Sequence, residues 1–300
     1  KQSIAFLSQG NLKNAFDKII ELSNELQSPV HRENIENMQQ SYRYMLQYFL
    51  KGMIDPERKL VYNKLIAKMF VQIADLREEL FTRDSSNFEF SQKRYFPFTP
   101  QPTLSDLENG LNRMEKMALL HEAETVDTKH ERGIQLEFET SIHFLFNYFW
   151  LKSRYDSPEI LNLYRLAMGE ANTDSVAKSM LVSALTLNLW RYFDETKLLM
   201  LLDACNTSDM YARERALAGL CFVLAKYNRF LPYFPAIRNR LVILADDNVI
   251  TEQLQNIIIQ IIATTETEQV SKKLQEEIFP ELMKLRPLMD EGLNPENLMN

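Results

Sequence analysis

The residues best suited to binding a metal ion lie together in one acidic stretch of the chain. It holds two histidines and four carboxylates: His121, Glu122, Glu124, Asp127, His130 and Glu131. Imidazole and carboxylate groups are common ligands of zinc. The stretch lacks a compact ligand spacing, however, and it crosses the junction between two expected helices, where charged side chains are commonly solvated. The sequence therefore predicts no metal site here.

A second candidate for chemistry is an acid–base pair. Glu139 precedes His143 by one helical turn, so its carboxylate could orient the imidazole as a general base. Isolated pairs with this spacing are more often surface contacts. The sequence also lacks the motifs of serine hydrolases, dinucleotide and phosphate loops, and paired-cysteine metal sites. We therefore expect no catalytic residue and no cofactor.

The elements that would position these residues are helices. The 300 residues include only 7 glycines, whereas an average composition of about 7% would give roughly 21. Phosphate loops and tight β-turns need glycine for backbone conformations with positive φ. This scarcity disfavours Rossmann, P-loop, β-sandwich and β-propeller folds. Abundant Leu, Glu, Lys, Gln and Met favour helices, so the sequence predicts an all-α fold.

Charge and cysteine content limit the partners and the compartment. The formal net charge is −7, which is unfavourable for binding a phosphate backbone, so we expect no nucleic-acid partner. Two cysteines, Cys205 and Cys221, fit buried positions in a reducing compartment, and we expect a cytoplasmic protein. No run of 18 apolar residues predicts a membrane span. The start at Lys1 and the abrupt acidic end suggest a fragment or a processed chain.

The chain divides into five expected parts. Residues 1–84 form helices with short breaks. Residues 85–102 form an ordered connection rich in aromatic residues and proline. The alternation of Phe88 and Phe90 predicts an extended backbone there, and we expect its five aromatic side chains to pack on the helices. Residues 103–156 give a helix pair, residues 157–288 give repeats, and residues 289–300 form an acidic tail or a linker to a missing part.

The strongest pattern in the sequence is an internal repeat. Three helices are expected to begin after Asp174, Asp209 and Asp247, each acting as an N-cap. Ser157 and Asp194 are further expected caps, and so are Thr173 and Ser271. When the three aspartates are aligned, apolar residues recur on one helical stripe. The aligned sets are Leu181, Ala216 and Leu254; Ala184, Gly219 and Ile257; Leu185, Leu220 and Ile258; and Leu189, Leu224 and Ile262. Gly219 on this stripe predicts close helix packing.

These repeats resemble known helical-repeat families. The segment from Asp209 to Leu220, with Arg213 inside the helix, looks like the second helix of a HEAT repeat, and the resemblance covers residues 157–288. The segment from Gly10 to Ala15 resembles the turn within a tetratricopeptide repeat, in residues 1–84. The whole chain is similar to large bacterial helical-repeat proteins of unassigned role. The resemblance implies a right-handed α-α superhelix of about 12–13 helices, an open solenoid that binds proteins along its concave surface.

We therefore expect a non-catalytic scaffold that binds a protein or peptide. The alternatives are an all-helical enzyme with an aromatic-lined pocket and a helical solenoid that binds nucleic acid through a stripe of Lys and Arg. Candidate partner-binding residues lie off the apolar stripe of the second helices: Ser179, Ser183, Arg213, Glu214, Arg215, Glu252 and Asn256. For Arg213 we favour a salt bridge to Asp174 or Asp209, linking neighbouring repeats. The sequence leaves the oligomeric state open.

Overall fold

The computed structural model describes residues 2–52, 56–113, 116–117, 119, 128–155, 157–169, 174–273 and 276, without the side chains of 266 and 269–273. Within these residues the chain forms α-helices and two short 3-10 helices, and no strand occurs. The predicted all-α class is therefore confirmed. None of the described helices is long and apolar enough to cross a membrane. The chain divides into two compact units, 1–250 and 251–300.

The helices follow one another with short connections. Their bounds are α1 Gln2–Ser8, α2 Leu12–Leu26, α3 Pro29–Leu50, α4 Arg58–Asp84, α5 Phe88–Tyr95, η1 Phe96–Phe98, α6 Leu104–Leu111, α8 Thr128–Leu151, α9 Pro158–Met168, α10 Ser175–Arg191, α11 Glu195–Ala204, α12 Met210–Tyr227, η2 Leu231–Tyr233, α13 Pro235–Ala245 and α14 Asn248–Lys273. Thirteen of these described elements are α-helices.

Helices α1 to α4 pack on one another through a shared apolar core. Leu7, Leu12, Phe16 and Ile19 are almost fully buried, and α4 adds Met69 to the core. The apolar side chains of α2 recur with the helical period, which places them on one face. Gly10 joins α1 to α2 with φ of +72°, a conformation that L-residues other than glycine rarely adopt. Helix α4 of this part contacts α5 and η2, which follow it in the chain.

The connection after α4 differs from the sequence prediction. The extended backbone expected at Phe88 and Phe90 is wrong, because these residues begin helix α5. Glu89 in the first turn and Lys93 in the last turn complement the helix dipole. This favours the helix more than the alternation of two aromatic residues favours a strand. Of the five aromatic side chains expected to pack on the helices, only Phe90 and Phe96 are buried. The others are exposed: Phe88, Tyr95 and Phe98.

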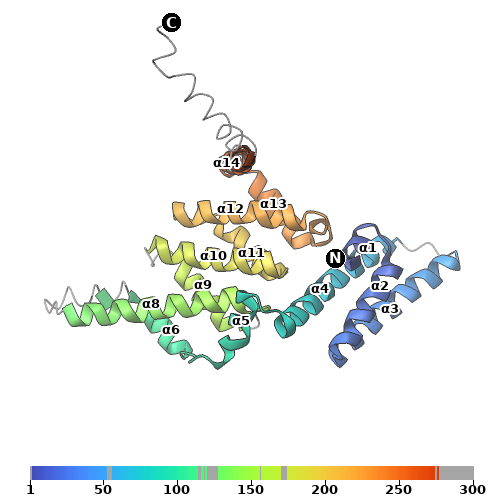
Figure 1. Ribbon diagram of the computed structural model, residues 1–300, viewed down its shortest axis with the longest axis horizontal. Coiled ribbons are helices and arrows are strands. Elements are labelled where there is room, and N and C mark those ends of the chain that lie inside the picture. The colour runs from blue at the N-terminus through green and yellow to red at the C-terminus, as the bar shows by residue number, and fades with distance from the viewer. Residues whose placement is uncertain are drawn as a thin grey trace, which may run out of the picture. The chain divides into compact units, whose positions relative to one another are not determined.

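In the second half, helices that begin at the predicted caps lie side by side. Helix α10 contacts α8 on one side and α12 on the other, and α11 contacts α10, α12 and α13 (Figure 1). The side chains of Asp174, Asp194 and Asp209 each accept a hydrogen bond from the backbone N–H three residues later. Ser157 caps α9 in the same way, and Asp247 accepts from the N–H groups of Val249 and Ile250. Thr173 and the side chain of Ser271 lie outside the described part.

The aligned apolar stripe is buried in two of its three copies. In α10 it is fully buried, and in α12 Ala216, Gly219 and Leu220 are buried. In α14 the aligned residues Ile258 and Ile262 are 46% and 53% exposed, so the burial expected for the third copy is wrong. Cys205 is buried as expected, whereas Cys221 is only half-buried.

Candidate functional site

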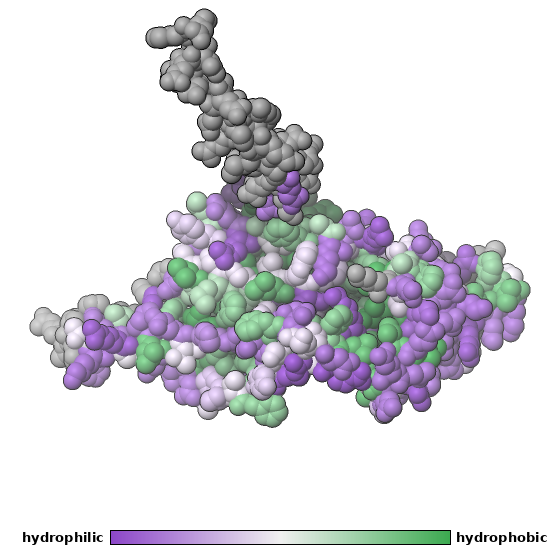
Figure 2. All heavy atoms as spheres, viewed as in Figure 1, coloured by the Kyte–Doolittle hydropathy of each residue, from purple (hydrophilic) through white to green (hydrophobic). Residues whose placement is uncertain are grey.

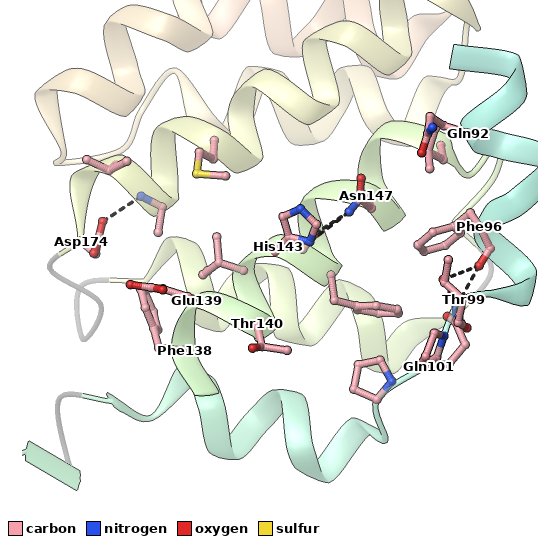
Figure 3. A pocket seen from close by; sticks show the side chains of 18 of the residues that line it. Gln92, Phe96, Thr99, Gln101, Phe138, Glu139, Thr140, His143, Asn147 and Asp174 are labelled. Carbon is pink, nitrogen blue, oxygen red and sulfur yellow. Dashed lines mark hydrogen bonds between the residues drawn. The ribbon is translucent and has the colours of Figure 1, made fainter. Parts of the chain in front are cut away.

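An open groove of about 1110 Å³ lies between three segments of the described chain (Figure 3). Three segments form its walls: residues 92–102, helix α8 and the first turns of α10. The lining residues are Gln92, Tyr95, Phe96, Thr99, Pro100, Gln101, Pro102, Gln135, Phe138, Glu139, Thr140, Ile142, His143, Phe144, Asn147, Leu151, Asp174, Val176, Ala177 and Met180. Apolar and amide side chains dominate this surface.

The wall made by residues 96–102 is held in shape by its own hydrogen bonds. The amide of Gln101 donates to the carbonyl oxygens of Phe96 and Thr99, each at 3.0 Å, and the Thr99 hydroxyl donates to the Phe96 carbonyl at 2.7 Å. The Phe96 ring packs against Phe144 of α8 with 5.8 Å between ring centroids. Proline at 97, 100 and 102 further restricts this backbone. The wall is therefore formed before any ligand arrives.

The rim of the groove carries uncharged amides that α8 positions. Gln135 donates to Glu139 at 2.6 Å, and Asn147 donates to the backbone carbonyl of His143 at 3.1 Å. Gln92 of α5 and Gln101 add two more amides to the lining. Each side-chain amide offers donors and an acceptor together. The rim can therefore pair with a peptide backbone, which presents the same two groups in alternation.

The acid–base pair suggested by the sequence lies in this groove but is not joined. Glu139 and His143 both line it, yet their side chains form hydrogen bonds with Gln135 and Asn147, each one turn away along α8. No group of three or more His, Cys, Asp or Glu side chains among the described residues is arranged to hold a metal ion. His121, Glu122, Glu124 and Asp127 of the predicted acidic stretch lie outside the described part.

The charges along the groove are acidic. Glu139 and Asp174 are its carboxylates, and its described lining contains no Lys or Arg. Arg113 lies just behind the wall, 3.5 Å from the Asp174 carboxylate and 4.2 Å from the centre of the Phe138 ring. Asp174 also accepts the N–H of Ala177 at 2.8 Å as the N-cap of α10. The negative charge of Asp174 is therefore compensated from the protein side.

Comparisons with protein-family models, with curated proteins and with solved structures find no match to this chain.

The predicted partner-binding residues lie elsewhere than the groove. Ser183 and Arg215 meet across two helices, where the Arg215 guanidinium donates to the Ser183 hydroxyl at 2.9 Å. Ser179 and Arg213 are half-buried, and Glu214 is exposed. Glu252 and Asn256 are exposed on α14, in the second compact unit. None of these seven side chains lines the groove, so their role in binding stays a prediction.

The salt bridge expected between Arg213 and the cap aspartates is not formed. Asp174 pairs with Arg113, and Asp209 accepts a hydrogen bond of 2.5 Å from the Ser175 hydroxyl instead. The Nε atom of Arg213 is buried without a hydrogen-bond partner. The Ser175 hydroxyl at the start of α10 occupies Asp209 instead of the Arg213 guanidinium one turn further along α12.

A stripe of exposed apolar side chains continues from the groove along α10. Val176 and Met180 line the groove, and Leu187 and Trp190 follow at helical spacing on the same face. Helix α12 repeats this pattern. Val176 and Tyr211 are 70% and 67% exposed at one aligned position, and Leu187 and Phe222 are 48% and 45% exposed at another. The rings of Trp190 and Phe222 lie 6.3 Å apart, so the two stripes are adjacent.

Sequence reasoning missed the groove because its walls come from three separate segments. The available signal was the Gln- and Pro-rich run from Gln92 to Pro102, followed by amides on the helix that begins at Thr128. From the sequence alone, this signal indicates only that the aromatic side chains pack on helices. The pairing of the run with α8 depends on contacts between residues that are distant in sequence.

Proposed function

We propose that this protein is a non-catalytic scaffold, built as a HEAT-like and tetratricopeptide-like α-α superhelix, that binds an extended segment of a partner protein in the groove. The observation that carries the proposal is the combination in one open groove of an apolar floor and an amide rim. Because the groove is open to solvent, a partner segment can enter it from the surface.

The chemistry of the groove suits a peptide. Side chains such as Phe138 and Ile142 form an apolar floor, where burying one Leu or Phe of a partner would contribute about 1.5–3 kcal/mol. The rim amides can satisfy the backbone N–H and C=O groups of an extended chain, as in other modes of peptide recognition. The volume of about 1110 Å³ exceeds the usual range of small-molecule pockets, roughly 300–1,000 Å³.

The surface beside the groove supports a partner longer than one pocket. Val176 and Tyr211, and likewise Leu187 and Phe222, expose apolar side chains at matching positions of α10 and α12. Neighbouring exposed apolar side chains such as these can be buried by a partner. Figure 2 shows hydrophobic residues scattered over the viewed face between hydrophilic ones. A partner segment leaving the groove would meet this surface next.

Two other functions fit the site less well. Nucleic acid needs a line of cations, and the described lining of the groove has none. An enzyme would need Glu139 and His143 to act together, whereas each bonds to a different neighbour on α8.

The two cysteines are free thiols, and we propose a cytoplasmic location on that ground.

A displayed library of random unstructured peptides tests the proposal. We expect the purified protein to select peptides whose binding, measured by fluorescence anisotropy, is abolished by Thr140→Trp, which fills the groove from an exposed position. Leu136→Trp is the matched control, because Leu136 is 65% exposed on the same helix and does not line the groove. Failure to select any peptide, or equal binding by both variants, would refute the proposal.

A further inference from the structure

We infer that the bound segment carries one Lys or Arg side chain, held by Glu139, beside apolar anchor residues. The inference rests on the proposed peptide-binding function and adds the chemistry of the partner. It follows from how the charges around the groove are distributed.

Of the two carboxylates in the described lining of the groove, Asp174 already has a counter-charge within the protein. Asp174 is paired with Arg113 at 3.5 Å, and the amino end of α10 adds a favourable dipole through the N–H of Ala177. The Arg113 side chain is only 17% exposed and lies over the Phe138 ring, so it is fixed behind the wall. Asp174 therefore has an internal counter-charge and is a poor site for a second cation.

Among the described residues, no Lys or Arg side chain pairs directly with Glu139. It is exposed, and its Oε1 atom accepts from the neutral Gln135 amide at 2.6 Å. The Gln135 oxygen accepts in turn from Arg113 at 2.7 Å, so the amide is oriented with its NH₂ toward Glu139. This chain of hydrogen bonds fixes the position of the carboxylate, and Arg113 reaches it only through the neutral amide. A carboxylate held in this way is a preorganised acceptor for one ammonium or guanidinium group.

The groove is also polarised from end to end. Glu139, Phe138 and Asp174 lie at one end in Figure 3, whereas Phe96, Thr99 and Gln101 lie at the other. The acidic end would take the basic side chain, and the end formed by Phe96 and the prolines would take an aliphatic or aromatic one. The net charge of −7 favours encounter with basic segments, and Glu139 disfavours acidic ones.

Two peptide libraries of equal apolar composition test this inference. In one library the only charged residues are Lys and Arg, and in the other they are Asp and Glu. We expect the first library to yield the tighter binders. For a selected basic peptide, Glu139→Gln should weaken binding about fivefold, the upper range for a partly exposed ion pair, and added salt should weaken binding to the unsubstituted protein more than to the variant.

A matched variant and a charge swap separate a direct contact from a general field. Glu137→Gln removes the same charge from an exposed site on α8 that pairs with Lys116 and does not line the groove, so it should leave binding within about twofold. Glu139→Lys should lose the basic peptide and gain its counterpart in which the Lys or Arg is replaced by Glu.

The outcomes distinguish the two proposals. If neither library yields a groove-dependent peptide, the proposed function itself fails. If acidic or uncharged peptides bind as tightly as basic ones in the groove, or if Glu139→Gln and Glu137→Gln act alike, the function stands and the assignment of Glu139 is overturned.

Discussion

The ammonium group of Lys197 donates a hydrogen bond to the side-chain oxygen of Asn188, 2.8 Å away, at a place where both residues are fully buried. Lys197 also donates to the backbone carbonyl of Lys152 at 2.8 Å and to that of Ser153. No carboxylate accepts a hydrogen bond from it among the described residues. Its charge is balanced by oxygen dipoles and by the rings of Tyr155 and Tyr192, at 4.5 and 5.0 Å.

The pair completes the carboxyl end of α8. The last carbonyls of a helix have no partner within the helix. The Asn188 amide donates to the carbonyls of Phe149, Trp150 and Lys152 at 2.7–2.9 Å, and the Lys197 ammonium adds a positive charge at the negative end of the helix dipole. Through these bonds, α10 and α11 fix the end of the helix that forms one wall of the groove.

Replacing Lys197 by Met should destabilise the protein by about 3 kcal/mol. Met keeps most of the volume but leaves the Ser153 carbonyl and the Asn188 side-chain oxygen without the ammonium donor, and each such loss costs about 1–3 kcal/mol. Urea denaturation followed by circular dichroism measures the change. Lys13→Met, at an exposed position of α2, is the control and should change stability by less than about 0.5 kcal/mol. Equal effects of the two variants would contradict the structural role of Lys197.

The parts of the fold that could be predicted are those with local causes. The cap aspartates need only the N–H groups of the following turn, and Asp174, Asp194 and Asp209 all act as expected. The contacts that join α4 to α5 and to the end of α10 are not local. Tyr192 bonds to Asp75 of α4 at 2.5 Å, and Glu78 of α4 accepts from Lys93 at 2.5 Å. No periodicity in the sequence signals pairs of this kind.

The candidate site was harder to predict for the same reason. Glu139 and His143 were identified as residues able to do chemistry, but their spacing alone suggests a mutual bond that the helix does not form. The wall from Phe96 to Pro102 was expected to be ordered, yet its partner helix was unknown. Short helices such as α5 also escape period analysis, because eight residues give little more than two turns.

Substitution of Gly219 by Ala should destabilise the protein, whereas the same change at Gly133 should stabilise it. A Cβ atom at Gly219 would lie 2.3 Å from the Thr186 hydroxyl oxygen, which is bonded to the Val182 carbonyl at 3.0 Å. Overpacking of this kind costs about 1–3 kcal/mol. Gly133 lies in α8 with nothing within 4 Å of its Cβ position, and Ala there should add about 0.5–1 kcal/mol.

A second substitution tests whether the contact with Thr186 causes the loss. Thr186→Ala removes both atoms closest to the new Cβ, so the double variant should recover part of the stability lost by Gly219→Ala. If Thr186→Ala adds its own loss without recovery, the two residues are not in contact as described. Thermal unfolding midpoints of the unsubstituted protein, the two single variants and the double variant measure this.

The link between Ser175 and Asp209 should appear as a coupling energy. Asp209 accepts from the Ser175 hydroxyl at 2.5 Å and from the N–H of Ala212 at 2.9 Å, so it joins the starts of α10 and α12. Asp209→Ala should lower the free energy of unfolding by about 1–2 kcal/mol, because it removes the N-cap of α12. In a double-mutant cycle with Ser175→Ala, we expect a coupling of about 0.5–1.5 kcal/mol. Additive losses would show that the hydroxyl does not serve Asp209.

The stability of the protein should fall steeply above about pH 10. Burial raises the pKa of the phenols of Tyr164, Tyr192 and Tyr227 above the ordinary value of 10.0, and it raises the pKa of Cys205 from 9.0 to about 12. In the unfolded chain these groups ionise at their ordinary pKa values, while in the folded chain they keep their protons. The folded state then binds more protons than the unfolded state, so the free energy of unfolding falls as pH rises.

Lys197 acts in the opposite direction, which allows a control. Burial lowers the pKa of Lys197 well below its ordinary value of 10.5. Between these two pKa values the unfolded chain binds one more proton at Lys197 than the folded chain does. The contribution of Lys197 to the free energy of unfolding therefore rises with pH up to about pH 10.5. The unsubstituted protein should lose about 3 kcal/mol between pH 10 and pH 11, measured by urea unfolding. In Lys197→Met the opposing contribution is absent, so its decline should begin at lower pH. A free energy of unfolding that stays constant to pH 11 would show that the three phenols are not buried as described.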